Sequence, residues 1–224
     1  MITVSDLAFS YGKKTILNGL SFSAGPGECV AIIGSNGSGK STTLSLITGA
    51  LKPERGTISV EGRIGFIPQG TALFEDMTVE DNLRFFAGLF HASVPKSLPF
   101  GLSGDLKKRV SKLSGGRKKQ VSIAAALLGD PENLLLDEPA AGLDLVYEQQ
   151  LVDLLQELKQ SGRTILYVGH NPLEYASVFD RIVFLGQGAP VYFSREDFGG
   201  SETDVGLIAG RISEYFKKHY ELKP

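Results

Sequence analysis

The residues best suited to chemistry form a glycine-rich loop near the N-terminus. The run Gly34-Ser-Asn-Gly-Ser-Gly-Lys40-Ser41 matches the pattern of glycine, four residues, then Gly-Lys-Ser/Thr. Glycines let backbone N–H groups turn inward around phosphate oxygens. A lysine at this place reaches β- and γ-phosphates, and the next hydroxyl binds Mg²⁺. The loop therefore predicts a nucleoside triphosphate site, formed by Gly34, Ser35, Asn36, Gly37, Ser38, Gly39, Lys40, Ser41 and Thr42.

The elements around this loop favour the same interpretation. The apolar run Cys29–Ile33 precedes it and predicts a strand buried on both faces. A helix pattern with Leu44 and Ile47 on one side follows and stops at Gly49. The N-terminus of that helix directs its positive dipole end at the same anion. The motif indicates a triphosphate but does not distinguish a kinase, a GTPase or a transport ATPase.

A pair of acids follows a second apolar strand. Leu134–Leu136 is followed directly by Asp137 and Glu138. A carboxylate at the end of a core strand lies at the carboxyl edge of the sheet, where Asp137 can hold Mg²⁺. Glu138, the next residue, points to the other side of the strand end. The alternative is two solvated acids at a helix start.

A histidine occupies the corresponding place after another predicted strand. His170 follows Thr164–Val168, at the edge where ligands of open α/β sheets bind. A lone histidine is usually structural, but this position favours a functional one.

The chain as a whole alternates strands and helices, which predicts an α/β fold with a largely parallel sheet. The short N-terminal strands predict an antiparallel β-subdomain. Two further strands are expected to be joined by the tight turn Glu61–Arg63, and four helices follow. The expected elements are strands at 57–60, 64–67 and 181–185, and helices at 79–90, 105–113, 120–128 and 147–159.

The segment 70–112 differs in character, because Ser93–Gly104 is rich in Pro, Gly and Ser between two helical patterns. We expect one domain over residues 1–224. Its nucleotide-binding core with the β-subdomain comprises 1–69 and 113–200, the inserted helical subdomain 70–112, and a C-terminal helix 201–224, whose apolar residues at helical spacing pack on the core.

The composition disfavours several classes of protein. The formal net charge of -2 argues against nucleic acid as the main partner. The single cysteine, Cys29, permits no disulfide within the chain, fits a reducing cytosol and is expected to be a small core residue. No apolar run approaches the roughly 18 to 20 residues that span a bilayer. If the protein serves membrane transport, another chain must form the pathway.

The segment Leu113-Ser-Gly-Gly116 distinguishes between the classes of triphosphate-binding protein that the phosphate loop leaves open. It resembles the signature motif of ATP-binding-cassette (ABC) ATPases, which other P-loop enzymes lack. Alone, a Ser-Gly-Gly turn before a helix is common. Its succession by Leu134–Pro139 matches the family order, and the resemblance extends from about residue 2 to residue 193. The chain is therefore similar to ATP-binding subunits of ABC transporters, with the P-loop NTPase fold, ATP and Mg²⁺.

The resemblance also implies roles for single residues. Glu138 would polarise the attacking water, His170 would contact the γ-phosphate, and Gln69 would sense Mg²⁺ and water. Tyr11 would stack on adenine, and Asp144 ends the D-loop. The implied catalytic residues are Glu138, His170 and Gln69, the metal ligands Ser41, Gln69 and Asp137, and the further nucleotide contacts Tyr11, Ser114, Gly115, Gly116 and Asp144.

In such proteins two subunits close around ATP, so that Ser114 and Gly116 act in trans. The resemblance implies a homodimer or heterodimer of ATPase subunits, peripheral on the cytoplasmic face of the cell membrane. The helix after the signature, with Lys118 and Lys119, would present its positive end to the γ-phosphate. An integral membrane permease would be reached through Phe85–Phe90, and 77–86 resembles exporter ATPases.

The sequence departs from the family in places. Many relatives have Gln directly after the signature glycines and Arg three residues later, whereas this chain has Arg117 and Gln120. The common Ala-Arg-Ala of the next helix is Ala124–Ala126, and the segment before Leu113 is short. Alternatives are an importer ATPase, a non-transport ABC ATPase, or a regulatory module without turnover. A GTPase is disfavoured, because no Asn-Lys-x-Asp motif occurs.

Overall fold

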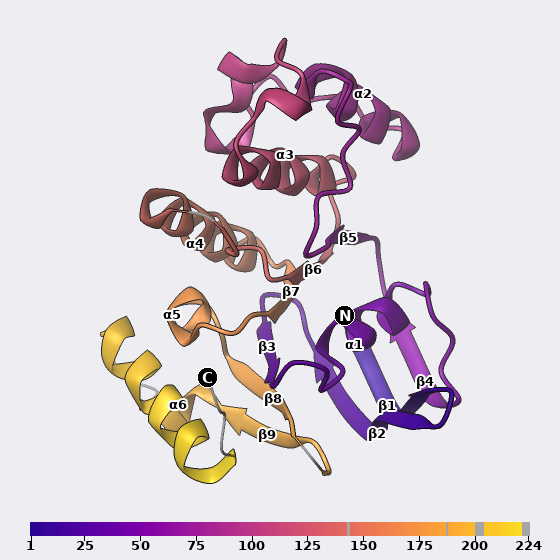
Figure 1. Cartoon of the computed structure of the whole chain (residues 1–224), viewed down its shortest axis with the longest axis vertical. Helices are drawn as coiled ribbons and strands as arrows, with labels where there is room; N and C mark the ends of the chain where they lie inside the picture. Colours follow the sequence, from indigo (N-terminus) through magenta and orange to yellow (C-terminus); the bar gives the residue numbers. More distant parts are fainter. Residues whose placement is uncertain (143, 187, 200–203, 221–224) are drawn as a thin grey trace.

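A six-stranded, mostly parallel sheet forms the centre of the protein (Figure 1). The computed structural model describes residues 1–142, 144–186, 188–199 and 204–220. Five neighbouring strands pair in parallel, and only the last joins antiparallel. In spatial order the strands are β5 (Ile64–Ile67), β6 (Asn133–Asp137), β7 (Thr164–Val168), β3 (Cys29–Gly34), β8 (Arg181–Leu185) and β9 (Val191–Ser194). The expected α/β class is confirmed.

A three-stranded antiparallel sheet lies beside the first. Its order is β2 (Lys14–Ala24), β1 (Ile2–Tyr11) and β4 (Arg55–Val60). Both strands expected around the turn Glu61–Arg63 form, but β4 pairs with β1 and β5 pairs with β6. The Asn133 side chain holds the turn between the sheets, because its amide donates to the carbonyls of Glu61 at 2.7 Å and Arg63 at 3.2 Å.

Most of the expected helices are present. The structure has α1 (Lys40–Ile47), α2 (Val79–Leu89), α3 (Gly115–Leu127), α4 (Leu145–Gln160), α5 (Pro172–Tyr175) and α6 (Val205–Tyr220). The helix expected from residue 120 begins at Gly115, because the Ser114 side chain caps it by accepting from the Arg117 N–H at 3.3 Å. Residues 201–203 and 221–224 of the expected C-terminal helix lie outside the described residues.

The helix expected at 105–113 is wrong. This stretch contains the end of the 3-10 helix η1 (Pro99–Asp105) and the short η2 (Val110–Lys112). The start of α2 takes up the carbonyls that a helix would need. The Val79 N–H donates to the Lys108 carbonyl, and the Glu80 N–H donates to the Leu106 carbonyl, both at 2.9 Å. A tertiary contact therefore replaces local helix bonding.

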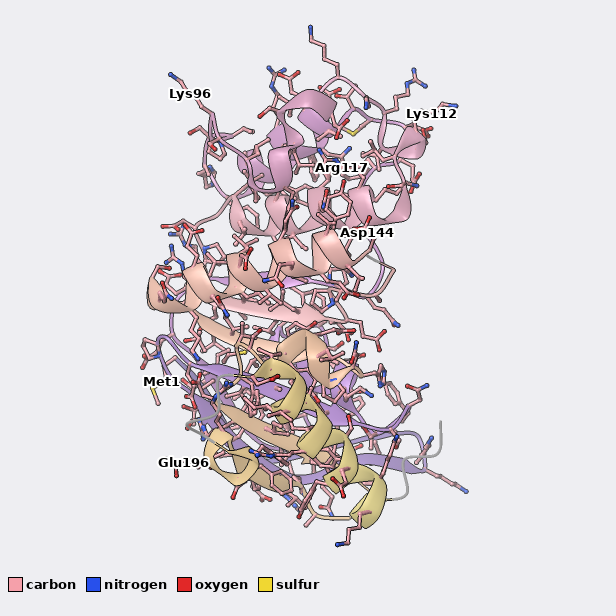
Figure 2. The ribbon with its side chains drawn as sticks, turned by 90° about the vertical axis from the view of Figure 1, so that its left-hand side faces the viewer. Met1, Lys96, Lys112, Arg117, Asp144 and Glu196 are labelled. Atoms are coloured by element: carbon pink, nitrogen blue, oxygen red, sulfur yellow. The ribbon has the colours of Figure 1, made fainter. Side chains whose placement is uncertain are left out.

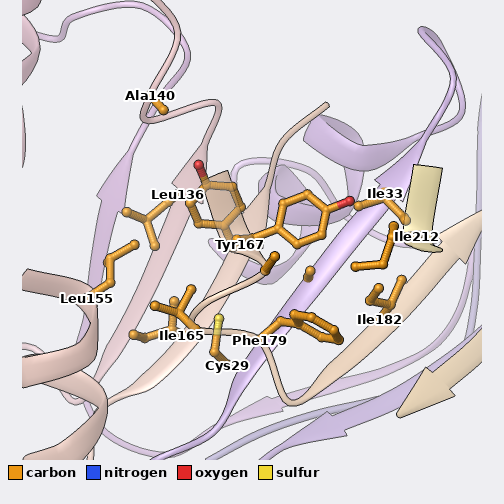
Figure 3. Close-up of a cluster of buried hydrophobic side chains, with 14 of the residues drawn as sticks. Cys29, Ile33, Leu136, Ala140, Leu155, Ile165, Tyr167, Phe179, Ile182 and Ile212 are labelled. Atoms are coloured by element: carbon orange, nitrogen blue, oxygen red, sulfur yellow. The ribbon is translucent and has the colours of Figure 1, made fainter. Parts of the chain in front are cut away.

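Two apolar clusters cover the two faces of the central sheet, and a third fills the helical layer. Figure 3 shows part of the first, where Cys29 and Tyr167 are fully buried with residues of α4 and α6. The expectation that Cys29 is a core residue is confirmed. The C-terminal helix packs on the core as expected, through Ile208, Ile212 and Phe216. The third cluster joins α2, η1, η2 and α3, which lie together at one end of the molecule (Figure 1).

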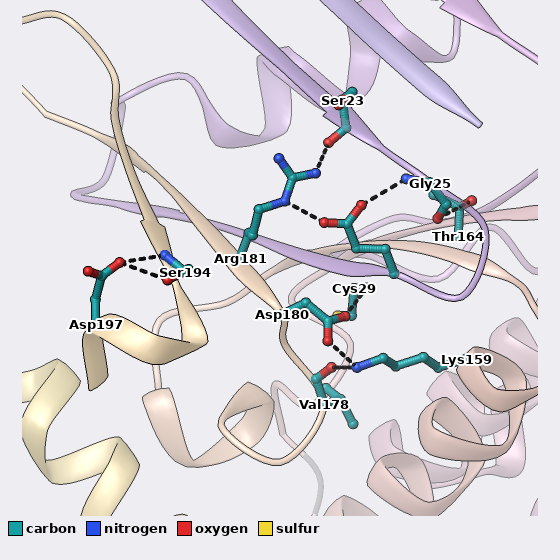
Figure 4. A network of polar contacts seen from close by, with 11 residues as sticks. Ser23, Gly25, Cys29, Lys159, Thr164, Val178, Asp180, Arg181, Ser194 and Asp197 are labelled. Carbon is teal, nitrogen blue, oxygen red and sulfur yellow. Dashed lines mark hydrogen bonds and ion pairs between the residues drawn. The ribbon is translucent and has the colours of Figure 1, made fainter. Parts of the chain in front are cut away.

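A polar network secures the entrance to β3, at the end opposite the glycine-rich loop (Figure 4). The Asp180 carboxylate accepts from the Cys29 N–H at 2.8 Å and from Lys159 Nζ at 2.7 Å. Arg181 pairs with Glu28, whose other oxygen accepts from the Gly25 N–H at 2.9 Å. These bonds fix β3 against the start of β8, so the loop after β3 starts from a fixed strand.

Replacing Phe216 tests the packing of α6. Phe216 is 2% exposed and stacks on Phe184 with ring centroids 4.7 Å apart. We expect F216A to lower the free energy of unfolding by about 3–5 kcal/mol, because it leaves a cavity in the core. Urea denaturation measures the loss. The control L207A alters the same helix at a residue 52% exposed, and we expect a change within about 0.5 kcal/mol. Equal losses for the two variants would contradict this packing.

Candidate active site

The glycine-rich loop joins β3 to α1 and wraps around the lysine at the start of that helix. Lys40 is only 6% exposed, and its Nζ donates to the carbonyls of Gly34 at 2.8 Å and Ser35 at 3.0 Å. Gly39 has a φ of 105°, and a Cβ there would lie 2.7 Å from Leu17 Cδ2. Burial lowers the pKa of Lys40, while the charges of Glu138 and Asp137 oppose the shift.

A cavity of about 490 Å³ opens over this loop. Tyr11 stands at its mouth, 54% exposed and edge-to-face with Phe9 at 4.9 Å between centroids. Lys14 and Ile16 of β2 also line it, which the sequence interpretation missed. The signal available in the sequence was that Lys14 and Ile16 are two residues apart in a strand after the turn at Gly12, so both side chains lie on one face. The full lining is Tyr11, Lys14, Ile16, Asn36, Gly37, Gly39, Lys40, Ser41, Thr42, Gln69 and Glu138.

Asp137 lies at the end of β6, and its side chain is suited to hold a cation. It is 5% exposed, and its Oδ1 has no hydrogen-bond partner among the residues that the structure describes. Burial raises the pKa of this carboxyl, and a hydrogen bond from Ser41 opposes the shift. A buried carboxylate oxygen without a donor, next to a hydroxyl, fits the hard oxygen ligands that Mg²⁺ prefers.

Glu138 connects two other expected residues. Its Oε2 accepts from Gln69 Nε2 at 2.8 Å, and its Oε1 lies 2.7 Å from His170 Nε2. The backbone of Glu138 is left-handed, with φ 48°, and its N–H donates to the Val168 carbonyl at 2.8 Å. Such a conformation in a non-glycine residue costs about 1–3 kcal/mol and is typical of functional sites. The structure thus brings Gln69, Glu138 and His170 together.

The turn that carries His170 has its own support, which the sequence did not reveal. The Tyr167 hydroxyl donates to Glu174 Oε2 at 3.0 Å, across the turn. Burial raises the pKa of the Glu174 carboxyl, and this hydrogen bond opposes the shift. The Asn171 side chain caps α5 by accepting from the Leu173 N–H at 3.2 Å. Both contacts restrict the backbone on either side of His170.

The signature residues and the D-loop aspartate do not join this group. Ser114, Gly115, Gly116 and Asp144 are not in the lining of the cavity. Ser114 caps α3, and the Asp144 carboxylate caps α4 by accepting from the Val146 N–H at 3.1 Å. Figure 2 marks the starts of α3 and α4 with Arg117 and Asp144. In the part of the chain that the structure describes, Ser114 and Asp144 thus cap the helices that follow them.

The departure from the family at Arg117 has a structural explanation. Arg117 Nε bonds Asp105 Oδ2 at 2.5 Å, and its Nη atoms donate to the carbonyls of Phe100 at 2.8 Å and Gly101 at 3.0 Å. Gln120 accepts from the same guanidinium at 2.7 Å. Hydrogen bonds from Lys108 and Arg117 lower the pKa of Asp105. Arg117 thus ties η1 to the signature helix.

The two lysines of the signature helix are engaged within the chain. Lys118 Nζ lies 2.7 Å from both carboxylate oxygens of Glu75. Lys119 is 3% exposed and donates to the carbonyls of Pro68 at 2.7 Å and Gln69 at 3.0 Å. Neither ammonium group is therefore free to add its charge to the positive end of the signature helix. A lysine three residues past the glycines gave no sequence signal for this inward position.

The strand-loop-helix, the two acids at the end of β6 and the histidine after β7 define a P-loop nucleoside triphosphatase. Comparison with known proteins identifies the family within this class. The family model described as ABC transporter matches residues 17–141, more than half of the chain. The chain belongs to the ABC transporter family, as an ATP-binding subunit, and is an ATPase.

Individual relatives agree with this family assignment. Linearmycin resistance ATP-binding protein LnrL of Bacillus subtilis is 33% identical, over 96% of this chain and 77% of the relative. Nod factor export ATP-binding protein I of Paraburkholderia xenovorans is 37% identical, over 81% of this chain and 66% of the relative.

Solved structures share the fold. An ATP-binding subunit of an ABC transporter superposes with a TM-score of 0.84 at 29% identity, covering 97% of this chain and 98% of the other. A dimeric post-hydrolysis ATP-binding cassette bound to ADP and phosphate has a TM-score of 0.73, over 87% and 99%, and at 22% identity it shows the fold alone.

Replacing Arg117 tests its link to η1. We expect R117Q to lower the free energy of unfolding by about 3 kcal/mol, because it breaks a mostly buried pair and leaves Asp105 with Lys108 alone. Chemical denaturation measures the loss. The control R55Q removes a pair whose side chains are 58% and 62% exposed, and should change stability by less than about 1 kcal/mol. An R117Q variant no less stable than R55Q would contradict the link.

Proposed function

We propose that this protein is the ATP-hydrolysing subunit of an ABC exporter, with Glu138 as the general base. The carrying observation is the Glu138 carboxylate held between Gln69 Nε2 and His170 Nε2, at 2.8 and 2.7 Å. A carboxylate within reach of a bound water can accept its proton as the water oxygen attacks the γ-phosphorus. The bond from that phosphorus to the β-phosphate oxygen then breaks, and ADP leaves.

The remaining residues position the substrate. The backbone of the glycine loop and Lys40 hold the phosphates, and Tyr11 stacks on the base. Ser41 and Asp137, with Gln69, would hold Mg²⁺, which would supply positive charge to neutralise the developing charge on the phosphate oxygens. His170 contacts the γ-phosphate and orients Glu138. Most of the rate then comes from positioning and electrostatics.

Completion of the site requires a second subunit. Ser114–Gly116 and Asp144 lie outside the cavity of their own chain, so we assign them to the nucleotide of a partner. Glycines without a side chain let the signature backbone approach phosphates closely. ATP would thus join two subunits, identical or related, and hydrolysis would release them. This division of labour also supports our assignment of residues 70–112 as an inserted helical subdomain.

The helical layer offers a surface for a membrane permease. Phe74, Phe85 and Leu89 are 45%, 42% and 60% exposed, and the first two rings lie 4.9 Å apart. A groove of about 200 Å³ lies next to them, lined by Pro68, Leu73, Phe86 and Phe90 among others. We assign this surface to the permease and the protein to the cytoplasmic membrane face. Within the described residues, no helix has the length and apolarity to cross a bilayer.

Export is favoured by the names of the relatives, one for Nod factor export and one for linearmycin resistance. The run 77–86, which resembles exporter ATPases, supports the same direction. Cross-linking from Phe85 and identification of the attached membrane protein would separate an exporter from an importer or from a non-transport ATPase.

Glu138→Gln tests the base and the paired state together. We expect turnover to fall by about 10²–10⁴-fold while ATP binding persists, because the amide cannot accept the proton. The variant should therefore elute as a dimer from a sizing column in ATP. The wild-type protein in ADP is the control and should elute as a monomer. A variant that stays monomeric at saturating ATP would refute the two-subunit site.

Lys40→Ala tests the phosphate loop. We expect ATP affinity to fall by about a hundredfold, because a charge-assisted contact worth about 3 kcal/mol is lost. Titration calorimetry measures the affinity. K13A removes a nearby lysine that does not line the cavity, and its affinity should stay within about twofold of wild type. Unchanged ATP affinity in K40A would overturn the assignment of the loop.

A further inference from the structure

Lys119 is a buried cation outside the phosphate loop. It lies on α3, five residues after the signature serine, and is 3% exposed. Among the described residues, no carboxylate lies within ion-pair distance of its ammonium group. Burying an ammonium costs free energy that an apolar side chain of similar length would avoid. The position therefore calls for a reason beyond packing.

The partners of Lys119 are two backbone carbonyls at the end of β5. Its Nζ donates to the Pro68 carbonyl at 2.7 Å and to the Gln69 carbonyl at 3.0 Å. β5 ends at Ile67, so these two carbonyls have left the ladder with β6. Both contacts are partly buried, and a partly buried carbonyl that has left the ladder is satisfied by another donor. Lys119 satisfies both carbonyls and fixes this irregular backbone against α3.

The fixed residue is the one whose side chain holds Glu138. Gln69 Nε2 donates to Glu138 Oε2 at 2.8 Å, while its own carbonyl accepts from Lys119. Two short contacts thus connect the signature helix to the carboxylate. We propose that Lys119 is a positioning residue for ATP hydrolysis, which holds Gln69 so that its amide keeps Glu138 in place, and which couples α3 to that site. This inference rests on the proposed function of Glu138 and Gln69.

Lys119→Met separates positioning from packing. Methionine keeps the length and apolar stem but removes both hydrogen bonds and the charge. We expect kcat to fall roughly tenfold or more, because a small displacement of a catalytic group is costly. The KM for ATP should stay within about twofold, since Lys119 does not line the nucleotide cavity. The Tm should fall less than in a variant that breaks an ion pair, because the removal of a buried charge offsets part of the cost of two carbonyls left without this donor.

Lys159→Met is the matched control. Lys159 also donates to a backbone carbonyl, that of Val178 at 3.0 Å, and it pairs with Asp180 near the opposite end of β3 (Figure 4). We expect K159M to lower the Tm and to leave kcat within about twofold of wild type. A K119M variant that loses kcat and also loses at least as much Tm as K159M, as in a general weakening of the fold, would overturn the proposal. So would a K119M variant with wild-type kcat.

A double-mutant cycle with Gln69→Ala tests whether Lys119 acts through Gln69. We expect Q69A to lower kcat, and K119M to lower it little further in the Q69A background. Losses that multiply would show that Lys119 acts by another route and would overturn the proposal. The cycle also separates the two hypotheses. If Q69A keeps wild-type kcat, the proposed role of Gln69 fails. If Q69A loses activity and K119M alone does not, only the inference about Lys119 fails.

Discussion

The parallel register of three strands determines where the chemistry can occur. Val168 of β7 pairs with Ile32 of β3 on one side and with Asp137 of β6 on the other. Because parallel strands end at the same edge, the residues that follow these three positions emerge side by side. The glycine loop, the acid pair and the His170 turn come from separate parts of the sequence. They meet only because the core strands are buried in this alignment.

The groups at this edge are costly for the fold. Lys40, Asp137 and Lys119 are each no more than 6% exposed, and Glu138 adopts a left-handed backbone. Buried charges and strained dihedrals reduce stability unless the surrounding structure holds them. The polar network at the entrance to β3 and the apolar clusters on both sheet faces provide that support. Stability is concentrated behind the site, and unfavourable groups are concentrated in it.

Much of this arrangement could be predicted from the sequence, because it depends on local patterns. The continuous apolar runs predicted the buried strands, two of them with the observed bounds of 164–168 and 181–185. The glycine loop and the acid pair were recognisable because short motifs specify them. The positions of Asp137 and His170 followed from strand ends at one sheet edge, whereas Gln69 came from the family resemblance alone, and the roles of these residues stay predictions.

The features that the sequence did not predict depend on contacts between distant segments. No local signal distinguishes a helix at 105–113 from a segment whose carbonyls are taken by the start of α2. Lys118 and Lys119 look alike in sequence, yet one pairs with Glu75 and the other is enclosed against the end of β5. β4 pairs with β1, and the turn that separates it from β5 is held by Asn133, which lies far along the chain. Such choices are tertiary, and periodicity does not encode them.

The separation of β4 and β5 into different sheets has a mechanical result. Tyr11, at the aromatic end of the cavity, ends β1, and β1 is hydrogen-bonded to β4. Only Glu61–Arg63 separates β4 from β5, which leads directly to Pro68 and Gln69. If the antiparallel sheet rotated when an adenine ring stacked on Tyr11, the motion would therefore pass through the three residues Glu61–Arg63 to β5, which leads to Gln69. A short stretch of backbone thus connects the two ends of the cavity, Tyr11 at one and Gln69 at the other.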